Sequence, residues 1–463
     1  MSEELALKTA TDLLHGYRRL DFSPLEATEA VLRRIARLDP KLNAFTLIDT
    51  EGALKAARAS TERWAKRSPD GRVDGVPITI KDLVLTKGWP TLRGSKAIDA
   101  AQPWTDDAPS VAFLRAENPV ILGKTTTPEF GWKGVTDSPL TGITHNPWNL
   151  EKTPGGSSGG AAAAAAAGLG ALHIGTDGGG SIRIPAGFTG IVGMKASFAR
   201  VPAWPASPFG TLSHVGPMAR SVSDTALMLT VMAQPDARDW YQHPRPCEDY
   251  RHGLDGGVGG LRIAYARTLA GATVDPEIAA LVEAAALGFR ALGATVDEVA
   301  PDLPDTNPVF RILWFAGAAN LLRSYTPEQQ ALMDPGLREI AAEGQRIGLL
   351  DYLAAQKARE SVGQTMKAFH QRYDLLLTPT LPIPAFEAGI EFLPGQQRWP
   401  DWTPFSYPFN LTQQPAITVP AGLTRTGLPA GLQIVGPMHE DGLVLRAAAA
   451  YERAVGPFPM PKL

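Results

Sequence analysis

The sequence contains a single cysteine, Cys247, among 463 residues, so an intrachain disulfide is excluded. A long chain without cysteine cross-links is typical of a reducing compartment. An excess of charge is also missing, because 44 Lys and Arg residues stand against 47 Asp and Glu residues. Binding to nucleic acid or to an anionic membrane requires clustered basic residues, and here the charges are scattered. We therefore predict no nucleic-acid partner.

Long apolar runs are missing as well. The alanine stretch Ala161–Ala167 is too short and too weakly apolar to span a bilayer. The N-terminus carries Glu3 and Glu4 and has no apolar segment of the kind that a secretory signal needs. We therefore predict a cytoplasmic protein that does not associate with a membrane.

The remaining composition is that of a large globular protein. The hydrophobic content of 44% is ample for an extensive core. The sequence has no internal repeat and no clear linker. We therefore predict one domain over residues 1–463, with an N-terminal helical segment of about residues 1–70 packed on the core.

Helical and strand patterns alternate along the chain. Ser23–Glu26 reads as a capping box with proline at the first helical position, which predicts the start of an amphipathic helix. Further helices are predicted at 53–66, 161–168, 221–232 and 276–292. Buried strands are predicted at 75–80, 120–123, 171–175, 261–265, 294–296, 373–378 and 416–419, and loops at 301–308 and 379–384. This alternation predicts an α/β fold, a central mixed β-sheet with helices covering both faces.

A lysine directly follows one of the predicted buried strands. Lysine is seldom fully buried without a partner or a task, so Lys81 is unusual at this position. Desolvation lowers the pKa of a lysine, and the neutral amine can then act as a base. The alternative is that Lys81 pairs with Asp82 or reaches the surface. For the lysine taken alone, this alternative is the favoured interpretation.

Two glycine-rich loops each hold a serine. Ser157 lies within Gly155–Gly160, and Ser181 follows Asp177–Gly180. Glycine lets a substrate approach the backbone closely. The consecutive N–H groups of Gly178, Gly179, Gly180 and Ser181 can converge on one point, as an oxyanion hole requires. Either loop alone is better explained as a structural turn or an anion-binding nest.

Taken together, the lysine and the two loops resemble the amidase signature family. Their serines stand 24 residues apart, and the resemblance extends from about Gly75 to Pro437. The other matching segments are Thr125–Phe130, His145–Asn149, Asp374–Pro379 and Asn410–Thr412. The combination is far more specific than any single glycine loop.

The resemblance implies a role for each matching residue. Ser181 matches the nucleophile, Lys81 the general base, and Ser157 the serine that bridges them after a cis peptide bond, here Gly156–Ser157. Gly178, Gly179 and Gly180 match oxyanion-hole positions. The residues expected to support the loops are Ser158, Asp177 and Arg183. The implied activity is hydrolysis of carboxylic amides through an acyl-enzyme, without a metal or an organic cofactor, and no compact His/Cys cluster has ligand spacing.

Three alternatives remain at this point. Gly155–Gly159 also satisfies the G-x-S-x-G nucleophile elbow of α/β-hydrolases, in which Ser157 would need a histidine such as His214, His370 or His439. A nucleotide-binding module is disfavoured, because no Lys-Ser/Thr pair follows the loop. Some members of the family are subunits of a tRNA-dependent amidotransferase. Their Tyr-Asp-Gly-x-Arg-Tyr-Gly stretch is missing here, and Gln413 stands where many relatives have glycine.

Aromatic clusters suggest the nature of the substrate. Pockets for apolar ligands are lined by aromatic side chains, although most aromatic residues simply fill the core. We expect Phe130, Trp132, Trp314 and Trp402 to line a pocket for a small-molecule amide with an apolar aryl or alkyl group. The alanine-rich helix faces are also compatible with a homodimer.

Overall fold

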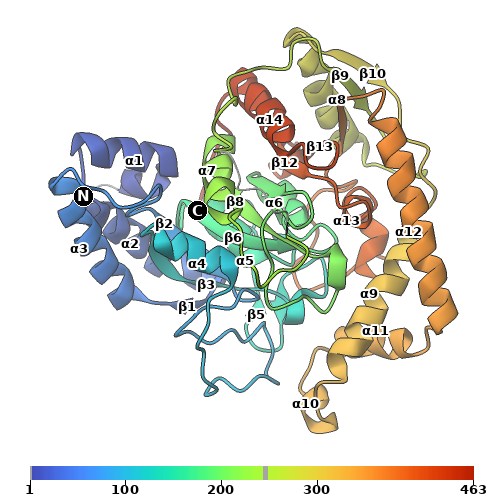
Figure 1. Ribbon diagram of the computed structural model, residues 1–463, viewed down its shortest axis with the longest axis horizontal. Helices are drawn as coiled ribbons and strands as arrows, with labels where there is room; N and C mark the ends of the chain where they lie inside the picture. Colours follow the sequence, from blue (N-terminus) through green and yellow to red (C-terminus); the bar gives the residue numbers. More distant parts are fainter. Residues whose placement is uncertain (1–2, 243–248) are drawn as a thin grey trace.

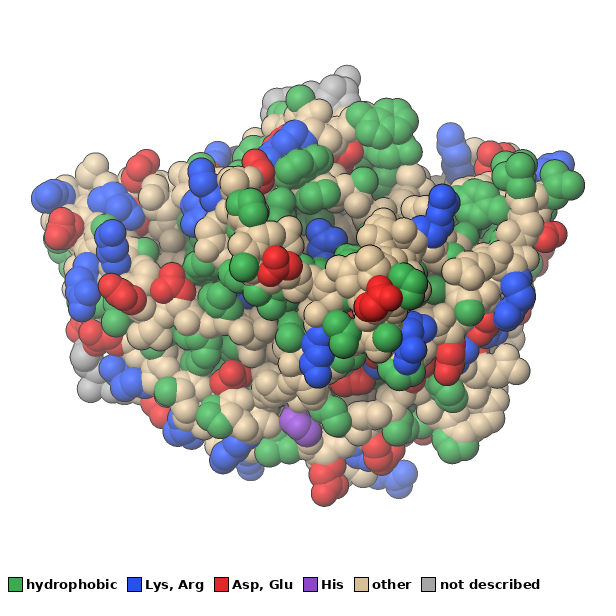
Figure 2. Space-filling model, turned by 90° about the horizontal axis from the view of Figure 1, so that it is seen from below, with side chains coloured by type: hydrophobic (Ala, Val, Ile, Leu, Met, Phe, Trp, Pro, Cys, Tyr) green, Lys and Arg blue, Asp and Glu red, His purple; other side chains and the backbone are tan. Residues whose placement is uncertain are grey.

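The computed structural model describes residues 3–242 and 249–463. Cys247 lies outside these residues. No helix within the described ranges combines the length and apolar character needed to cross a bilayer. On the face that Figure 2 shows, Lys and Arg side chains are interspersed with Asp and Glu side chains, as the scattered charges of the sequence predict.

In the described part of the chain, eleven strands form one mixed sheet in the order β1-β3-β2-β6-β8-β7-β12-β13-β11-β9-β10. Helices flank this sheet (Figure 1), which confirms the predicted α/β class. The strands are Phe45–Ile48 (β1), Pro77–Lys81 (β2), Val120–Thr125 (β3), Leu172–Asp177 (β6), Val192–Lys195 (β7), His214–Ala219 (β8), Arg262–Tyr265 (β9), Thr295–Glu298 (β10), Leu375–Pro379 (β11), Ala416–Leu423 (β12) and Pro429–Val435 (β13). Asp137–Ser138 (β4) and Gly142–Ile143 (β5) form a separate pair.

The helices divide into groups around the sheet. In Figure 1, α1–α3 lie on one side of the molecule and α9, α11 and α12 on the other. The α-helices are Ala10–Arg19 (α1), Pro24–Leu42 (α2), Thr50–Ala65 (α3), Pro109–Ala116 (α4), Gly159–Ala166 (α5), Arg183–Thr189 (α6), Val222–Met232 (α7), Pro276–Ala291 (α8), Asn307–Leu322 (α9), Pro327–Ala331 (α10), Pro335–Gln345 (α11), Leu349–Phe369 (α12), Pro408–Leu411 (α13) and Asp441–Val455 (α14). Short 3-10 helices are Glu3–Leu7 (η1), Glu129–Gly131 (η2), Gly210–Leu212 (η3) and Trp399–Trp402 (η4).

The predicted capping box at the start of α2 is confirmed. The Glu26 N–H donates to Ser23 Oγ at 3.2 Å, and the Ser23 N–H donates to Glu26 Oε2 at 2.8 Å. The hydrogen bonds to its Ser23 partner lower the pKa of the Glu26 carboxyl. The helix therefore begins at Pro24, as the sequence predicts.

The parallel strands β3, β2 and β6 create the edge at which the candidate residues meet. Ile80 of β2 lies opposite Lys124 of β3 and Ile174 of β6. Because parallel strands end at the same edge of a sheet, Lys81 at the end of β2 comes close to the loop that follows Asp177. The fold therefore brings together two segments that are about a hundred residues apart in the sequence.

The alanine-rich helix α5 is packed unusually closely against its neighbours. All of its residues are buried. A Cβ atom added at Gly160 would lie 2.4 Å from Thr126 Oγ1 and 2.6 Å from the Ala44 carbonyl oxygen, so no larger residue fits there. The helix begins at Gly159, two residues before the predicted start. Small side chains thus let this helix lie beside the strands that carry the site.

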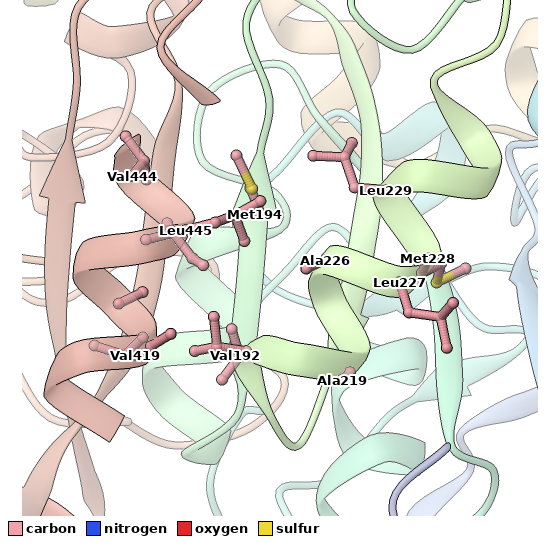
Figure 3. Packing of buried hydrophobic residues seen from close by; sticks show 14 of the residues in the cluster. Val192, Met194, Ala219, Ala226, Leu227, Met228, Leu229, Val419, Val444 and Leu445 are labelled. Atoms are coloured by element: carbon pink, nitrogen blue, oxygen red, sulfur yellow. The ribbon is translucent and has the colours of Figure 1, made fainter. Parts of the chain in front are cut away.

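The core beside the site combines α7 and α14 with the central strands (Figure 3). Leu229 of α7 and Leu445 of α14 are buried together with Met194 of β7 and Val419 of β12. Each fully buried side chain of this size contributes roughly 1.5–3 kcal/mol through apolar burial. This packing buries one face of the middle of the sheet under α7 and α14.

One predicted loop is wrong at its end. The proline-rich stretch 301–308 was expected to be irregular throughout, but α9 begins at Asn307. Pro308 lies in the first turn of this helix, where a missing N–H costs nothing because no intrahelical acceptor is available there. Proline therefore marks the start of a helix here rather than a loop.

Candidate active site

Lys81 lies fully buried at the end of β2 and contacts three hydroxyl groups. Its Nζ lies within hydrogen-bonding distance of Ser157 Oγ at 2.7 Å, of Ser158 Oγ at 2.9 Å and of Thr176 Oγ1 at 2.9 Å. The alternative in which Lys81 pairs with Asp82 is wrong. Asp82 pairs instead with Lys124, whose Nζ lies 3.0 Å from Asp82 Oδ1.

Burial controls the protonation of Lys81. Desolvation lowers the pKa of Lys81 well below the usual value of a lysine, and the negative charge of Asp177 raises it by a smaller amount. No described carboxylate forms an ion pair with Lys81 Nζ. This position therefore favours a neutral amine.

The two serine loops are joined directly. The Gly156–Ser157 peptide bond is cis, as the resemblance implies. The Ser158 N–H donates to the Ser181 carbonyl oxygen at 3.1 Å. Ser158 Oγ donates to the Thr176 carbonyl oxygen at 3.1 Å and accepts from the Thr176 N–H at 3.2 Å. Ser158 thus links the first loop both to the second loop and to the end of β6.

A buried carboxylate organises the second loop. Asp177 Oδ1 accepts from the Gly180 N–H at 2.8 Å, and Asp177 Oδ2 accepts from the Ile182 N–H at 3.2 Å. Burial alone would raise the pKa of Asp177, but the Arg183 guanidinium holds it well below its usual range. The Gly180 N–H, which we expected in the oxyanion hole, is therefore already bonded to Asp177, since the tight turn folds it back onto this carboxylate.

Arg183 anchors this loop to the C-terminal part of the chain. Its guanidinium donates to Asp177 at 2.9 and 3.0 Å, to Asn410 Oδ1 at 2.7 Å and to Gln433 Oε1 at 2.7 Å. The Asn410 amide in turn donates to Asp177 Oδ1 at 2.8 Å. All of these side chains are buried, so every donor needs an acceptor. Arg183 therefore contacts protein groups, which fits the supporting role implied by the resemblance.

Asn410 and Gln433 are two residues whose contribution the sequence reasoning missed. Asn410 entered the prediction only within a matching segment, and Gln433 did not enter it at all. They lie 227 and 250 residues from Arg183, and each is locally an ordinary polar residue. The only available signal was a polar side chain amid apolar neighbours, such as Gln433 in the run that forms β13.

Aromatic rings press against the nucleophile loop from outside. A Cβ atom at Gly178 would lie 2.8 Å from the Trp314 ring, and one at Gly179 would lie 2.6 Å from the Trp399 ring. Gly180 has a φ of +127°, which L-residues rarely adopt. The three glycines are therefore required by close packing and by backbone conformation.

One cavity opens onto both serines. Its wall includes Ser157 and Ser181, together with the predicted residues Phe130 and Trp314. Segments that the sequence analysis did not assign to the pocket also line the wall, among them Leu83–Leu85, Pro202–Phe209 and Ser213–Val215. The lining is mainly apolar, so it suits the apolar part of a ligand.

Two of the predicted pocket residues do not line this cavity. Trp132 is fully buried, and its carbonyl oxygen accepts from Trp314 Nε1 at 3.0 Å. Trp402 stacks on Phe188 with ring centroids 5.9 Å apart and donates through Nε1 to the Glu391 carbonyl oxygen at 3.0 Å. Both rings belong to the core behind the cavity, where large aromatic surfaces are most readily buried.

The histidines do not form the partner that a nucleophile elbow at Ser157 needs. His214 lines the cavity, but its Nδ1 lies 2.9 Å from the Leu212 carbonyl oxygen, and burial lowers its pKa. His370 Nδ1 lies 3.0 Å from the Tyr373 carbonyl oxygen. Among the described residues, Ser157 Oγ has Lys81 and no histidine as its hydrogen-bond partner. No set of three His, Cys, Asp or Glu side chains within the described ranges is placed to hold a metal ion.

Gln413 occupies a strained position behind the site. Its φ of 65° lies in the left-handed region that favours glycine. Its Nε2 donates to the Thr211 carbonyl oxygen at 3.1 Å, and its own carbonyl oxygen accepts from the Phe198 N–H at 3.0 Å. The side-chain bond partly compensates for the strain that a non-glycine residue meets here.

Comparisons with known proteins agree with this geometry. The family model described as Amidase matches residues 26–445. An acylamidase from Rhodococcus erythropolis is 38% identical over 459 residues, covering 97% of this chain and 96% of that protein. A glutamyl-tRNA(Gln) amidotransferase subunit from Myxococcus xanthus (strain DK1622) is 38% identical over 456 residues, covering 92% of this chain and 93% of that protein.

A solved structure shares the whole fold. The crystal structure of a bacterial aryl acylamidase, assigned to the amidase signature enzymes, superposes with a TM-score of 0.89 at 32% identity. The match covers 97% of this chain and 96% of that one.

Proposed function

This chain belongs to the amidase signature family and is an amidase that hydrolyses amide bonds, and we propose that it does so through a Ser–Ser–Lys relay with Ser181 as nucleophile. The observation that carries this proposal is the 2.7 Å contact between the buried Lys81 Nζ and Ser157 Oγ. The same Ser157 shares a cavity wall with Ser181. These two observations support a relay that runs from the buried amine of Lys81 through Ser157 to Ser181.

A count of the available protons supports Ser157 as the hydroxyl that donates to Lys81. A neutral amine has two hydrogens and one lone pair, so one of its three hydroxyl contacts must run toward the nitrogen. Ser158 Oγ already donates its hydrogen to the Thr176 carbonyl oxygen at 3.1 Å. Ser157 and Thr176 both contact Lys81 and line the cavity. The Ser157 contact is the shorter, at 2.7 Å against 2.9 Å, so we assign to Ser157 the hydrogen bond that donates to the amine.

In the proposed reaction, Lys81 accepts the proton of Ser157 as Ser157 accepts that of Ser181. Ser181 Oγ then attacks the amide carbonyl carbon and forms the tetrahedral intermediate. We assign the oxyanion to the N–H groups of Gly178, Gly179 and Ser181, because the Gly180 N–H is bonded to Asp177. The relay returns the proton to the departing nitrogen. Water then hydrolyses the acyl-enzyme by the reverse transfers.

The substrate that we propose is an amide with an apolar aryl or alkyl group. The mainly apolar wall around Phe130, Phe209 and Trp314 supports this choice. So does the similarity to an acylamidase and to an aryl acylamidase. We favour a free-standing amidase over a component of an amidotransferase, because the Tyr-Asp-Gly-x-Arg-Tyr-Gly stretch is missing from the sequence. Its small cysteine content supports a cytoplasmic location.

The nucleophile can be identified by trapping the acyl-enzyme. Mixing the enzyme with 4-nitroacetanilide, quenching in acid and mapping the peptides by mass should place an acetyl group on Ser181. Steady-state release of 4-nitroaniline should be lost in Ser181→Ala and Lys81→Ala while both variants stay folded. An acetyl group on Ser157, or near-full activity of Lys81→Ala at neutral pH, would show that the relay is wrong.

A panel of amides tests the substrate class. Benzamide and phenylacetamide should be hydrolysed with a higher kcat/KM than malonamate, because the cavity wall is mainly apolar. Equal or better hydrolysis of malonamate would contradict the preference for an apolar group while leaving the relay intact.

A further inference from the structure

Arg93 introduces a charge into the mainly apolar cavity. It lines the same cavity as Ser157 and Ser181. Among the described residues of that wall, it is the only Lys, Arg, Asp or Glu side chain. A charged group in such a wall loses hydration and needs a compensating partner.

The protein itself does not supply an anionic partner. Within the described part of the chain, no carboxylate pairs with the Arg93 guanidinium and no side chain or carbonyl accepts from it. Arg238, which lines the adjoining cavity, differs in both respects. It lies 2.6 Å from Asp236 and its guanidinium stacks 4.9 Å from the centre of the Trp204 ring. The five donors of Arg93 therefore remain available to a ligand.

The backbone of Arg93 is held firmly in an unfavourable conformation. Its φ is 55°, in the left-handed region. The Arg93 N–H donates to the Asp82 carbonyl oxygen at 3.1 Å, and its carbonyl oxygen accepts from the Phe130 N–H at 2.7 Å. Asp82 follows Lys81 directly and is itself bound by Lys124. Strain of this kind persists where surrounding structure imposes it, and it is concentrated at functional sites.

We propose that Arg93 binds a carboxylate of the substrate, so that the preferred amides combine an apolar body with one carboxylate remote from the bond that is cleaved. The planar guanidinium matches a carboxylate with two parallel hydrogen bonds. This inference rests on the proposed function, because it assumes that the substrate occupies the cavity shared with Ser181. The carboxylate belongs either to the acyl part or to the amine part of the substrate, and the experiment separates the two.

Matched pairs of substrates isolate the contribution of the carboxylate. Benzamide and 4-carbamoylbenzoate differ by a carboxylate on the acyl part, whereas acetanilide and 4-acetamidobenzoate differ by one on the amine part. In one of the two pairs, wild-type enzyme should show the higher kcat/KM for the charged member. Arg93→Gln should lower this charged-to-neutral ratio about 10-fold to 100-fold, mainly through KM, because a charge-assisted bidentate contact is lost. Because the ratio compares two substrates of the same variant, a loss of activity that affects both equally leaves it unchanged.

Lys96→Gln provides the matched control. Lys96 is exposed, lies three residues away and is not part of the cavity wall, so this change removes the same charge without the contact. The charged-to-neutral ratio should be unchanged. Arg93→Lys should recover only part of the ratio, because an ammonium group cannot form the paired hydrogen bonds.

A binding measurement keeps the inference testable without turnover. In the Ser181→Ala background, the Kd is measured for 4-carbamoylbenzoate and for 4-acetamidobenzoate. For the compound that the kinetic pairs favour, the Kd should rise about 10-fold or more when Arg93→Gln is added. If both pairs of amides are hydrolysed but neither ratio depends on Arg93, and if the Kd is unchanged, the carboxylate assignment is wrong while the amidase function stands. If no amide is hydrolysed by wild type, the proposed function fails, and the Kd values of 4-carbamoylbenzoate and 4-acetamidobenzoate then decide whether Arg93 binds a carboxylate.

Discussion

Two buried lysines on neighbouring strands have opposite surroundings. Lys81 ends β2 and Lys124 lies on β3, where it is opposite Ile80. Both side chains have an exposed fraction of zero. Lys124 Nζ lies 3.0 Å from the Asp82 carboxylate and 2.5 Å from Thr91 Oγ1, and it donates to carbonyl oxygens nearby. Lys81 Nζ contacts only hydroxyl oxygens among its described partners.

This difference indicates that burial alone does not decide the role of a lysine. Desolvation lowers the pKa of both residues, but for Lys124 the attraction of Asp82 opposes it. For Lys81 the opposing charge is that of Asp177, which is itself paired with Arg183. A carboxylate partner keeps Lys124 as a charged structural element, whereas hydroxyl partners favour an amine that accepts a proton. The comparison predicts that one lysine serves chemistry and the other serves stability.

The largest effect is expected from Lys81→Met. Removing a general base costs about 100-fold to 10,000-fold in rate, so kcat for amide hydrolysis should fall by that factor. The thermal unfolding midpoint should not decrease by more than a few degrees, because a desolvated amine is exchanged for a side chain of similar length that needs no solvation. Steady-state kinetics and calorimetry on the same sample measure both quantities. A large loss of stability with intact activity would mean that Lys81 serves stability rather than chemistry.

Lys124→Met should give the opposite pattern. It leaves the Asp82 carboxylate buried without its partner, which costs about 3–5 kcal/mol in the free energy of unfolding. Urea unfolding measures this loss. The kcat of the fraction that remains folded should stay within a few fold of wild type, because Lys124 does not contact either serine.

The double variant Lys124→Met/Asp82→Asn serves as the control. Because it removes both members of the buried ion pair and keeps a side chain of the same size at position 82, it should recover part of the lost stability. The double variant is compared with the two single variants, Lys124→Met and Asp82→Asn. If its loss in the free energy of unfolding exceeds the sum of their losses, the ion pair with Asp82 is not the source of the stability that Lys124 contributes.

The pH dependence sharpens the comparison further. The pKa of Lys81 is lower in the folded protein than in the unfolded chain, so burial of the charged amine costs stability. Below the folded pKa this cost is complete, because Lys81 is then protonated in both states. That cost disappears as the pH rises toward the unfolded value of about 10.4. The stability of Lys81→Met relative to wild type should therefore be greatest at low pH and should decline as the pH rises. Wild-type kcat/KM should rise through the folded pKa, since the base must be neutral.

Chemical unfolding of wild type and Lys81→Met at several pH values, beside a pH–rate profile, checks both parts. A stability difference that grows with rising pH would mean that Lys81 is held as the ammonium ion.

Sequence patterns captured the part of this site that is local. A buried strand ending in Lys81 and two glycine loops could be recognised because each is a continuous segment. The pairing of Asp82 with Lys124 could not be predicted, because the adjacent Lys81 is the nearest candidate partner in the sequence. Only the parallel register of β2 and β3 brings Lys124 to this carboxylate. Pairing across strands is a property of the sheet, and the local pattern does not contain it.

The cavity wall shows the same limit. All four predicted aromatic residues belong to one buried cluster, but only Phe130 and Trp314 also line the cavity beside the serines, whereas Trp132 and Trp402 do not. An aromatic side chain has the same apolar surface in either place, so composition cannot separate the two. The sequence analysis missed Arg93, because its distinguishing property is a place in the cavity wall without a carboxylate partner among the described residues. Only the folded structure shows this property.

The smallest expected effect compares single hydroxyl groups beside the two lysines. Ser158→Ala removes one of three hydroxyls around Lys81 Nζ but leaves Ser157 and Thr176 in contact. Since the Ser158 hydrogen is bonded to the Thr176 carbonyl oxygen, Ser158 positions the amine and does not carry its proton. We expect kcat to fall about 3-fold to 10-fold, the effect of one hydrogen bond. The shape of the pH–rate profile should be unchanged.

Thr91→Val is the matched change beside Lys124, whose Nζ lies 2.5 Å from Thr91 Oγ1. It should lower the free energy of unfolding by about 1–3 kcal/mol, because Lys124 loses one hydrogen-bond partner. The kcat should be unchanged, because Lys124 has a structural role. If Ser158→Ala instead lowers kcat as far as Lys81→Met does, Ser158 rather than Ser157 passes the proton. The relay would then run through the serine that joins the two loops, and the 2.7 Å contact of Ser157 would be structural.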